Sequence, residues 1–193
     1  ARGIVRNSLL SLALVLAAFG AARADDAILV LDASGSMWGR IDGKTKVEIA
    51  RAVVGDLLGK IPAERRLGLV AYGHRREGDC KDIEEVVAVG GDRQAIRKAV
   101  EGLSFKGKTP LSDAVRYAAE KLQYTRDKAT VILVSDGAET CNVDPCALGR
   151  ELEAAGVDLT VHVVGFGLSS EIETPGLRCL AEATGGRYFG ARN

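Results

Sequence analysis

The stretch Ala27-Ile-Leu-Val-Leu-Asp-Ala-Ser-Gly-Ser36 contains the pattern that decides the fold. Its continuous apolar run predicts a strand buried on both faces of a sheet, because a strand with one face in water would alternate apolar and polar residues. The run ends at Asp32 and continues into small polar residues, which is typical of the carboxyl end of a parallel strand, where ligands bind. The stretch therefore indicates a parallel sheet with a functional edge directly after its first strand.

Strand-like and helix-like segments alternate along the rest of the chain. Further segments rich in β-branched residues are expected to form strands at 66–72, 130–135 and 157–166. Apolar residues at helical spacing predict helices at 47–58, 96–103, 111–122, 144–156 and 177–184. Such alternation is typical of parallel strands joined by right-handed crossovers. We therefore expect an α/β fold of the doubly wound class, with a mostly parallel sheet and helices on both faces.

One segment breaks this alternation. Residues 82–89 follow the expected strand at 66–72 after only a short polar loop, which is too short for a crossover helix. We expect these two segments to pair as an antiparallel hairpin, with 82–89 as an edge strand of the sheet. A short last strand is expected at 187–189, after the turn Gly185-Gly186.

The first 24 residues have the composition of a secretory signal peptide. Arg2 and Arg6 precede an apolar run at 9–22, which ends in the A-x-A cleavage signal Ala22-Arg23-Ala24. An uncleaved membrane anchor is the alternative, but this run is short for a bilayer, which needs about 20 residues. We therefore expect cleavage of residues 1–24, no stable membrane insertion afterwards, and one exported domain at 25–193.

The charge balance argues against a general nucleic-acid binder. The 193-residue chain has 26 lysines plus arginines and 26 aspartates plus glutamates. Removal of residues 1–24 takes away three arginines and no acidic residue, which leaves the expected domain mildly acidic. Binding to DNA or RNA relies on a surplus of cationic side chains that release counterions from phosphates. Nucleic acid is therefore not an expected partner.

The four cysteines, Cys80, Cys141, Cys146 and Cys179, all lie in the segment expected to be exported. Oxidising compartments favour disulfides, and the spacing of these cysteines does not match the common zinc-ligand patterns. Successive right-handed crossovers would place the helices that carry Cys146 and Cys179 side by side. Pairing of Cys146 with Cys179 and of Cys80 with Cys141 is therefore weakly preferred. The alternative is a local Cys141–Cys146 loop with Cys80 bound to Cys179.

Three polar clusters fall where the expected strands end or the next helix begins. They are Asp32-Ala-Ser-Gly-Ser36, Lys108-Thr109-Pro110 and Ser135-Asp136-Gly137. In an extended loop, side chains at alternate positions from Asp32 to Ser36 point the same way. The clusters supply carboxylate and hydroxyl oxygens without thiolate or imidazole, which suits Mg²⁺, or Mn²⁺ and Ca²⁺ less selectively. The candidate metal ligands are Asp32, Ser34, Ser36, Thr109 and Asp136.

These clusters resemble the metal-ion-dependent adhesion site of von Willebrand factor type A domains. The likeness includes D-x-S-G-S at 32–36, Thr109 and Ser-Asp-Gly at 135–137, and it covers roughly residues 26–190 in the order of elements. The chain is most similar to bacterial exported members of this family. That similarity implies a periplasmic location, whereas the signal peptide by itself equally allows secretion.

The resemblance also implies a role for each candidate ligand. Ser34, Ser36 and Thr109 would ligate the metal directly, while Asp32 and Asp136 would act directly or through water. None of these residues departs from the family pattern, so the resemblance implies an intact site.

Four further residues are candidates for contact with a ligand or for a place in the core. Met37 and Trp38 follow the first cluster and are expected either to contact a ligand beside the ion or to pack over the sheet edge. His74 is expected in a solvated loop, with partner contact as the weaker alternative. His162 alternates within an apolar strand and is expected in the core or under a helix.

The sequence predicts an exported, metal-dependent protein-binding module and no enzyme. An ion held mainly by neutral hydroxyls and water stays electrophilic, so an Asp or Glu side chain of an unknown partner protein could complete its coordination. A metal-dependent hydrolase is an alternative, but the chain lacks both a second Asp two residues after Asp32 and a G-x-S-x-G nucleophile elbow. A metal-independent structural scaffold is the other alternative.

Overall fold

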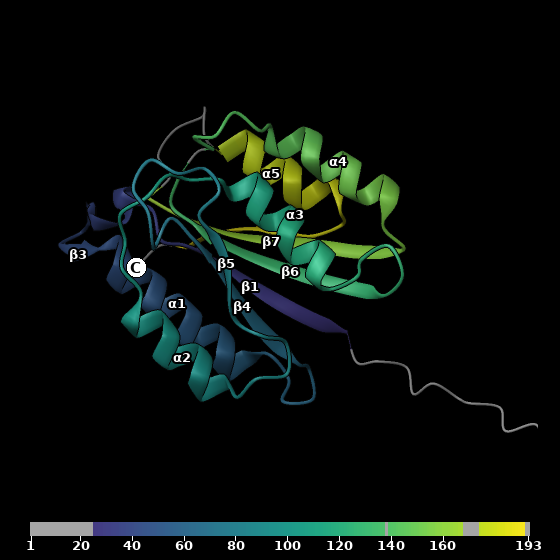
Figure 1. The fold of residues 1–193 in the computed structure, drawn as a ribbon, viewed down its shortest axis with the longest axis horizontal. Helices are drawn as coiled ribbons and strands as arrows, with labels where there is room; N and C mark the ends of the chain where they lie inside the picture. The colour runs from purple at the N-terminus through teal and green to yellow at the C-terminus, as the bar shows by residue number, and fades with distance from the viewer. Residues whose placement is uncertain (1–24, 138, 168–173, 192–193) are drawn as a thin grey trace, which may run out of the picture.

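The computed structural model describes residues 25–137, 139–167 and 174–191 and contains a twisted six-stranded sheet between two layers of helices (Figure 1). The strands of this sheet are β1 (Asp26–Asp32), β4 (Leu67–Tyr72), β5 (Ile83–Val87), β6 (Lys128–Ser135), β7 (Asp158–Phe166) and β8 (Tyr188–Ala191). The helices are α1 (Lys46–Lys60), α2 (Arg93–Gly102), α3 (Leu111–Lys121), α4 (Pro145–Ala155) and α5 (Thr174–Ala183). The expected signal peptide, residues 1–24, lies outside the described residues.

The strand order is β5-β4-β1-β6-β7-β8. β4 pairs antiparallel with β5, and all other neighbours in the sheet are parallel. The prediction of a mostly parallel, doubly wound sheet with one antiparallel edge strand is therefore confirmed. β1 has β4 on one side and β6 on the other, so the strand order reverses beside β1. In open α/β sheets, ligands bind at the carboxyl ends of the strands that flank such a reversal.

Each face of the sheet has its own apolar core, and β1 contributes to both. Ile28 and Val30 pack with α3, α4 and α5, whereas Leu29 and Leu31 pack with α1 and α2. The continuous apolar run of the sequence is explained by this burial on both faces. Figure 1 shows the two helical layers on opposite sides of the sheet.

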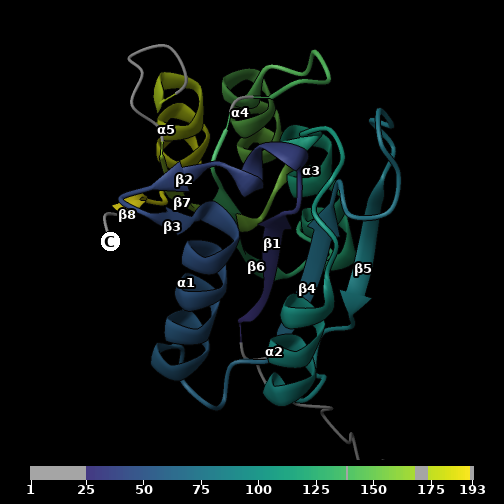
Figure 2. The same cartoon turned by 90° about the vertical axis from the view of Figure 1, so that its left-hand side faces the viewer.

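Two small elements between β1 and α1 were not predicted. The 3-10 helix η1 (Gly35–Trp38) follows β1, and the hairpin of β2 (Arg40–Ile41) and β3 (Lys44–Thr45) leads into α1. The hairpin turns at Asp42-Gly43, where both residues have positive φ angles of 48° and 85°. An Asp-Gly pair is a common hairpin turn, but each strand has only two residues and carries no apolar alternation. Figure 2 shows the hairpin beside the start of α1, at the edge where β1 ends.

The start of α1 is fixed by a capping box. The Thr45 hydroxyl accepts a hydrogen bond from the Glu48 amide, and the Glu48 carboxylate accepts one from the Thr45 amide. Such reciprocal bonds satisfy two of the free amides at a helix start. The first residue of α1, Lys46, is thereby held at a defined position next to the edge where β1 ends. None of the helices in the described ranges is long and apolar enough to cross a membrane.

Candidate metal site

The loop after β1 brings Ser34 and Ser36 together. The Ser34 amide donates a hydrogen bond of 2.8 Å to Asp32 Oδ1, and the Ser34 and Ser36 hydroxyl oxygens lie 2.9 Å apart. The prediction of an extended loop through Ser36 is wrong, because Ser36 lies in the 3-10 helix η1. The turn of this helix nevertheless places the two hydroxyls next to each other.

Asp136 approaches these serines from the neighbouring strand β6. Its side chain is 1% exposed, and its Oδ1 atom accepts a hydrogen bond of 3.0 Å from the Ser36 hydroxyl. β1 and β6 are parallel neighbours, so their carboxyl ends meet at the same edge. The polar clusters after these two strands therefore form one site.

Thr109 is positioned by the loop before α3. Its amide donates to the Thr140 hydroxyl at 2.8 Å, and the Thr140 amide donates to the Thr109 carbonyl at 3.1 Å. Thr109 lines the same open cavity, of about 580 Å³, as Ser34, Ser36 and Asp136. Four of the five candidate ligands thus line one cavity. The fifth, Asp32, lies beneath the floor of the cavity and is hydrogen-bonded to the Ser34 amide.

The loop that carries Thr109 lies against the loop after β4 because two glycines meet there. The Gly107 amide donates a hydrogen bond of 2.7 Å to the Gly73 carbonyl. A Cβ atom on Gly107 would lie 2.6 Å from Gly73 Cα, closer than non-bonded carbon atoms approach each other. Gly73 also has a backbone φ angle of +73°, which residues other than glycine rarely adopt. The close approach sets the position of the 107–109 segment beside Ser34.

Asp32 is a fully buried carboxylate below the cavity. Its Oδ2 atom accepts a hydrogen bond of 2.8 Å from the Ser135 hydroxyl, to which the buried Tyr72 hydroxyl in turn donates at 3.3 Å. Burial, and then the negative charge of Asp136, raise the pKa of Asp32 to about 6, although hydrogen bonds from Ser34 and Ser135 oppose the shift. Burial and the neighbouring Asp136 carboxylate thus both disfavour the ionised form of Asp32, and a cation beside it would favour that form.

The donor set fits a hard divalent cation better than zinc. In the part of the chain that the structure describes, no group of three or more His, Cys, Asp or Glu side chains could hold a metal. The five candidate ligands instead supply two carboxylates and three hydroxyls, all of them oxygen donors, and the Asp32 carboxylate lies below the cavity. Oxygen-only sites with few charges suit Mg²⁺, which keeps several of its waters. Ligation by the predicted residues remains a prediction, although the structure brings them together.

Sequence reasoning missed Lys46 as a member of the site. Its ammonium lies 2.8 Å from Asp136 Oδ2 and its side chain is 18% exposed. Lys46 also lines the cavity described above. It reaches the site through the β2–β3 hairpin, which was not predicted, so no local pattern in the sequence pointed to it.

Met37, Trp38, His74 and His162 differ in burial. Met37 is fully buried among the residues packed with α1 and α2, whereas Trp38 is 59% exposed and donates from its indole to the Phe105 carbonyl at 2.8 Å. The prediction of a solvated His74 is wrong: its side chain is 7% exposed, with Nε2 3.2 Å from the Glu84 carboxylate. His162 is only half-buried, so a fully buried core position is wrong, whereas a position under a helix stays a prediction.

The weakly preferred disulfide pairing is confirmed. Cys80 pairs with Cys141, and Cys146 pairs with Cys179. The first disulfide ties the loop before β5 to the 139–142 segment, which also supplies Thr140. The second joins α4 to α5, which pack side by side (Figure 1). Two disulfides fit an oxidising, extracytoplasmic compartment.

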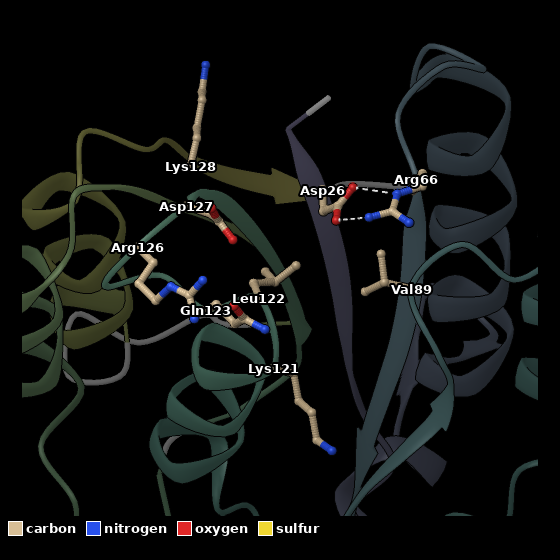
Figure 3. A pocket seen from close by; sticks show the side chains of 9 residues that line it. All are labelled: Asp26, Arg66, Val89, Lys121, Leu122, Gln123, Arg126, Asp127 and Lys128. Carbon is tan, nitrogen blue, oxygen red and sulfur yellow. Dashed lines mark hydrogen bonds and ion pairs between the residues drawn. The ribbon is translucent and has the colours of Figure 1, made fainter. Parts of the chain in front are cut away.

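A second pocket, of about 350 Å³, lies at the opposite edge of the sheet, where β1 begins (Figure 3). Arg66 in its lining is paired with Asp26 through hydrogen bonds of 2.9 and 2.5 Å. Figure 3 shows that Lys121 and Lys128 point in opposite directions, so their charges do not converge. The lining contains no Ser, Thr, Cys or His side chain.

Comparison with protein families gives one matching family model. The model described as the von Willebrand factor type A domain matches residues 27–139. Among curated proteins, the uncharacterised protein YwmD of Bacillus subtilis (strain 168) is 28% identical, over all of this chain and 90% of its own length. YwmC from the same strain is 27% identical, over 84% of this chain and 75% of its own length.

Several solved structures share the fold. SpaC, a pilus adhesin from Lactobacillus rhamnosus GG, aligns at a TM-score of 0.70 and 17% identity over 88% of this chain and 28% of its own. A von Willebrand factor type A protein from Catenulispora acidiphila aligns at 0.67 and 20% identity over 88% and 39%. Proximal thread matrix protein 1 from the mussel byssus, described with a zinc-occupied MIDAS motif, aligns at 0.61 and 18% identity over 87% and 41%. This chain thus spans less than half of each of these three structures.

Proposed function

Because the chain belongs to the von Willebrand factor type A domain family, we propose that it is an exported, metal-dependent protein-binding module. Domains of this family are typically adhesion or interaction modules and are usually non-catalytic. In the proposed function, a divalent cation at the carboxyl edge of the sheet coordinates an Asp or Glu side chain of a partner protein. The observation that carries the proposal is that the Ser36 hydroxyl oxygen lies 2.9 Å from the Ser34 hydroxyl oxygen and 3.0 Å from Asp136 Oδ1.

Each candidate ligand has a proposed task. Ser34, Ser36 and Thr109 hold the cation directly, and Asp32 and Asp136 hold it directly or through water. Bound there, Mg²⁺ (or Mn²⁺ or Ca²⁺) supplies an electrophilic centre with a position open to a carboxylate. Asp32 also orients the loop, because it accepts hydrogen bonds from the Ser34 amide and the Ser135 hydroxyl. The mussel byssus protein, which shares the fold and has a zinc-occupied motif, supports the proposal of a divalent cation in this chain.

Export and location are part of the proposal. Residues 1–24 have a signal-peptide pattern, and both disulfides fit an oxidising compartment. We therefore place the domain, residues 25–193, in the periplasm or outside the cell.

Thermal unfolding tests the metal site. Residues 25–193, with disulfides intact, are unfolded in EDTA and in Mg²⁺, Mn²⁺ or Ca²⁺. A cation at 100 times its dissociation constant should stabilise the native state by about 2.7 kcal/mol, because it binds only the folded chain. Ser34→Ala should abolish the shift, whereas Ser104→Ala, an exposed serine in the loop before Thr109, should preserve it. An equal response in both variants would contradict the proposal and favour the metal-independent scaffold.

Selection of peptides tests the partner chemistry. A displayed library of random peptides is selected against the domain in Mg²⁺ and eluted with EDTA. Eluted peptides should share an Asp or Glu and should not bind the Ser34→Ala variant. Selection of peptides without an acidic residue, or binding that survives EDTA, would contradict a metal-bridged carboxylate.

A further inference from the structure

Lys46 places a positive charge of the protein itself inside the candidate metal site. Its ammonium lies 2.8 Å from Asp136 Oδ2, while the other oxygen of that carboxylate accepts from Ser36. Asp136 is 1% exposed and Lys46 is 18% exposed, so water screens this pair weakly. The pair involves a carboxylate that the proposed function assigns to the cation.

The path of the Lys46 side chain is built into the fold. A Cβ atom on Gly167 would lie 2.9 Å from Lys46 Cε, and one on Gly39 would lie 3.4 Å from it. The two glycines therefore leave room for the aliphatic stem. The Lys46 amide also donates to the Gly39 carbonyl at 2.8 Å, and the capping box at Thr45 fixes the start of the helix.

A lysine is electrostatically unfavourable where Lys46 stands. The start of a helix carries a partial positive charge, which favours acidic residues there and disfavours cations. The contact with Asp136 offsets this cost, so the ammonium is held in place by the carboxylate rather than by the helix. A cation bound to the Asp136 carboxylate would weaken the contact between Asp136 and Lys46. The cation and the Lys46 ammonium would also repel each other, because both are positively charged.

The charge count of the site shows the consequence. Asp32 and Asp136 carry two negative charges when ionised, and Lys46 carries one positive charge. The metal-free site then carries one net negative charge, and a divalent cation changes this to one net positive charge. A carboxylate from a partner returns the site to neutrality. Without Lys46, the two carboxylates alone neutralise the divalent cation.

We propose that Lys46 competes with the divalent cation for Asp136 and makes firm retention of the cation depend on a carboxylate from the partner. The inference rests on the proposed function and adds a regulatory feature to the same site. Lys46 thereby stabilises the metal-free domain and ties metal binding to partner binding. It acts through Asp136 and the charge of the site, so it is a positioning residue and not a ligand.

Calorimetric titration with MgCl₂ tests this proposal on residues 25–193. The variants are Lys46→Met, Lys46→Gln and the matched control Lys44→Met, which removes an exposed lysine from the neighbouring strand β3. Removal of the Lys46 charge should tighten Mg²⁺ binding about tenfold or more, because a dication and a monocation a few ångströms apart repel appreciably even in bulk water. Lys44→Met should match the wild type.

Acetate serves as the carboxylate probe in a second set of titrations. Sodium acetate replaces sodium chloride at constant ionic strength. Acetate should tighten Mg²⁺ binding more in the wild type than in either Lys46 variant, since only the wild-type site retains a positive charge to neutralise.

The outcomes separate the inference from the proposed function. Equal Mg²⁺ affinity in the wild type and both Lys46 variants, lost in Ser34→Ala, would overturn the inference and leave the metal site standing. Equal tightening by acetate in all proteins would overturn the coupling to a carboxylate. Absence of Mg²⁺ binding from the wild type and both Lys46 variants would overturn the proposed function and the inference together. Binding by the Lys46 variants alone would support strong competition.

Discussion

Asp82 is a buried carboxylate whose hydrogen bonds make stability depend on pH. It accepts hydrogen bonds from the Arg75 and Arg76 amides at 2.7 and 2.8 Å and from the Arg75 side chain at 2.8 Å. Burial opposes ionisation, but these bonds outweigh it and hold the pKa of Asp82 below its usual value of 3.8. The stabilisation is therefore present above pH 3.8 and is lost as pH falls through the lower pKa of the folded state.

Asp82→Asn should lower the free energy of unfolding by about 2 kcal/mol at pH 7, since it breaks buried bonds to a charged group. Urea unfolding at pH 7 and at pH 3 or below measures this difference, which should shrink toward acid because the wild type then loses the same charge. Asp56→Asn, in an exposed pair with Lys60, should change stability by less than about 0.5 kcal/mol. A difference that stays constant with pH would contradict the role of the Asp82 charge.

Gly186 lies where no side chain fits. A Cβ atom there would lie 1.9 Å from the Val161 carbonyl oxygen, a backbone atom of β7 that cannot move aside. Gly186→Ala should therefore destabilise the fold by about 3 kcal/mol or more. Gly185→Ala is the matched control: Gly185 has a φ angle of +73° but open space around it, so its cost should be about 1–2 kcal/mol. Chemical denaturation of both variants checks the order, and equal losses would contradict it.

Residues that carry the site differ in how far the sequence predicts them. Asp32 is the last residue of an apolar strand and Ser34 follows it closely, so the sequence alone predicts that both lie at the edge of the sheet. Lys46 joins them only through a short hairpin and a contact with Asp136 across the fold. His74 stands in a run of charged residues that suggests solvent, yet pairing of β4 with β5 buries it beside Glu84.

At the scale of elements, only one of the two disulfides is connected to the candidate metal site. The bond between Cys80 and Cys141 holds the segment whose Thr140 exchanges hydrogen bonds with Thr109. The bond between Cys146 and Cys179 joins α4 to α5, which contribute none of the candidate ligands. Only the first disulfide should therefore influence cation binding.

Paired substitution to serine separates these roles. Loss of either disulfide should lower stability by about 4 kcal/mol, because the cysteines are 61 and 33 residues apart and chain entropy depends weakly on loop length. Loss of the Cys80–Cys141 bond should also weaken Mg²⁺ binding, whereas loss of the Cys146–Cys179 bond should not. Calorimetry at a temperature where both variants are folded measures the affinity. Equal affinities would show that Thr109 needs no support from this disulfide.

Long elements with clear periodicity were predictable, and short ones were not. Strand β1 has an unbroken apolar run. Helix α4 begins at Pro145 and is capped by Asp144, whose carboxylate accepts a hydrogen bond of 2.9 Å from the Cys146 amide. By contrast, η1 and the β2–β3 hairpin are too short for any apolar repeat to appear. Their conformation is set by contacts such as the Gly35 amide with the Gly107 carbonyl at 3.0 Å, which depend on the folded sheet.

At the scale of the whole molecule, the sheet couples two cores that lie on its opposite faces. Adjacent residues of β1 enter different cores, Ile28 with α3, α4 and α5, and Leu29 with α1 and α2. The candidate ligands come from segments after β1, before α3 and after β6, so the site exists only when both layers are in place. We therefore expect both layers to unfold in a single transition, and we expect a bound cation to raise the temperature of that transition.

Ile28→Ala and Leu29→Ala test this coupling from the two faces. Each side chain is fully buried, so each variant should lose about 2–5 kcal/mol of stability. If the layers unfold together, either substitution lowers one transition, seen at the same temperature by far-UV circular dichroism and by Trp38 fluorescence. Mg²⁺ should then raise that transition in both variants. Separate transitions, with Leu29→Ala melting α1 and α2 first, would instead mean that Lys46 can leave the site while the strands that carry Asp32 and Asp136 stay folded.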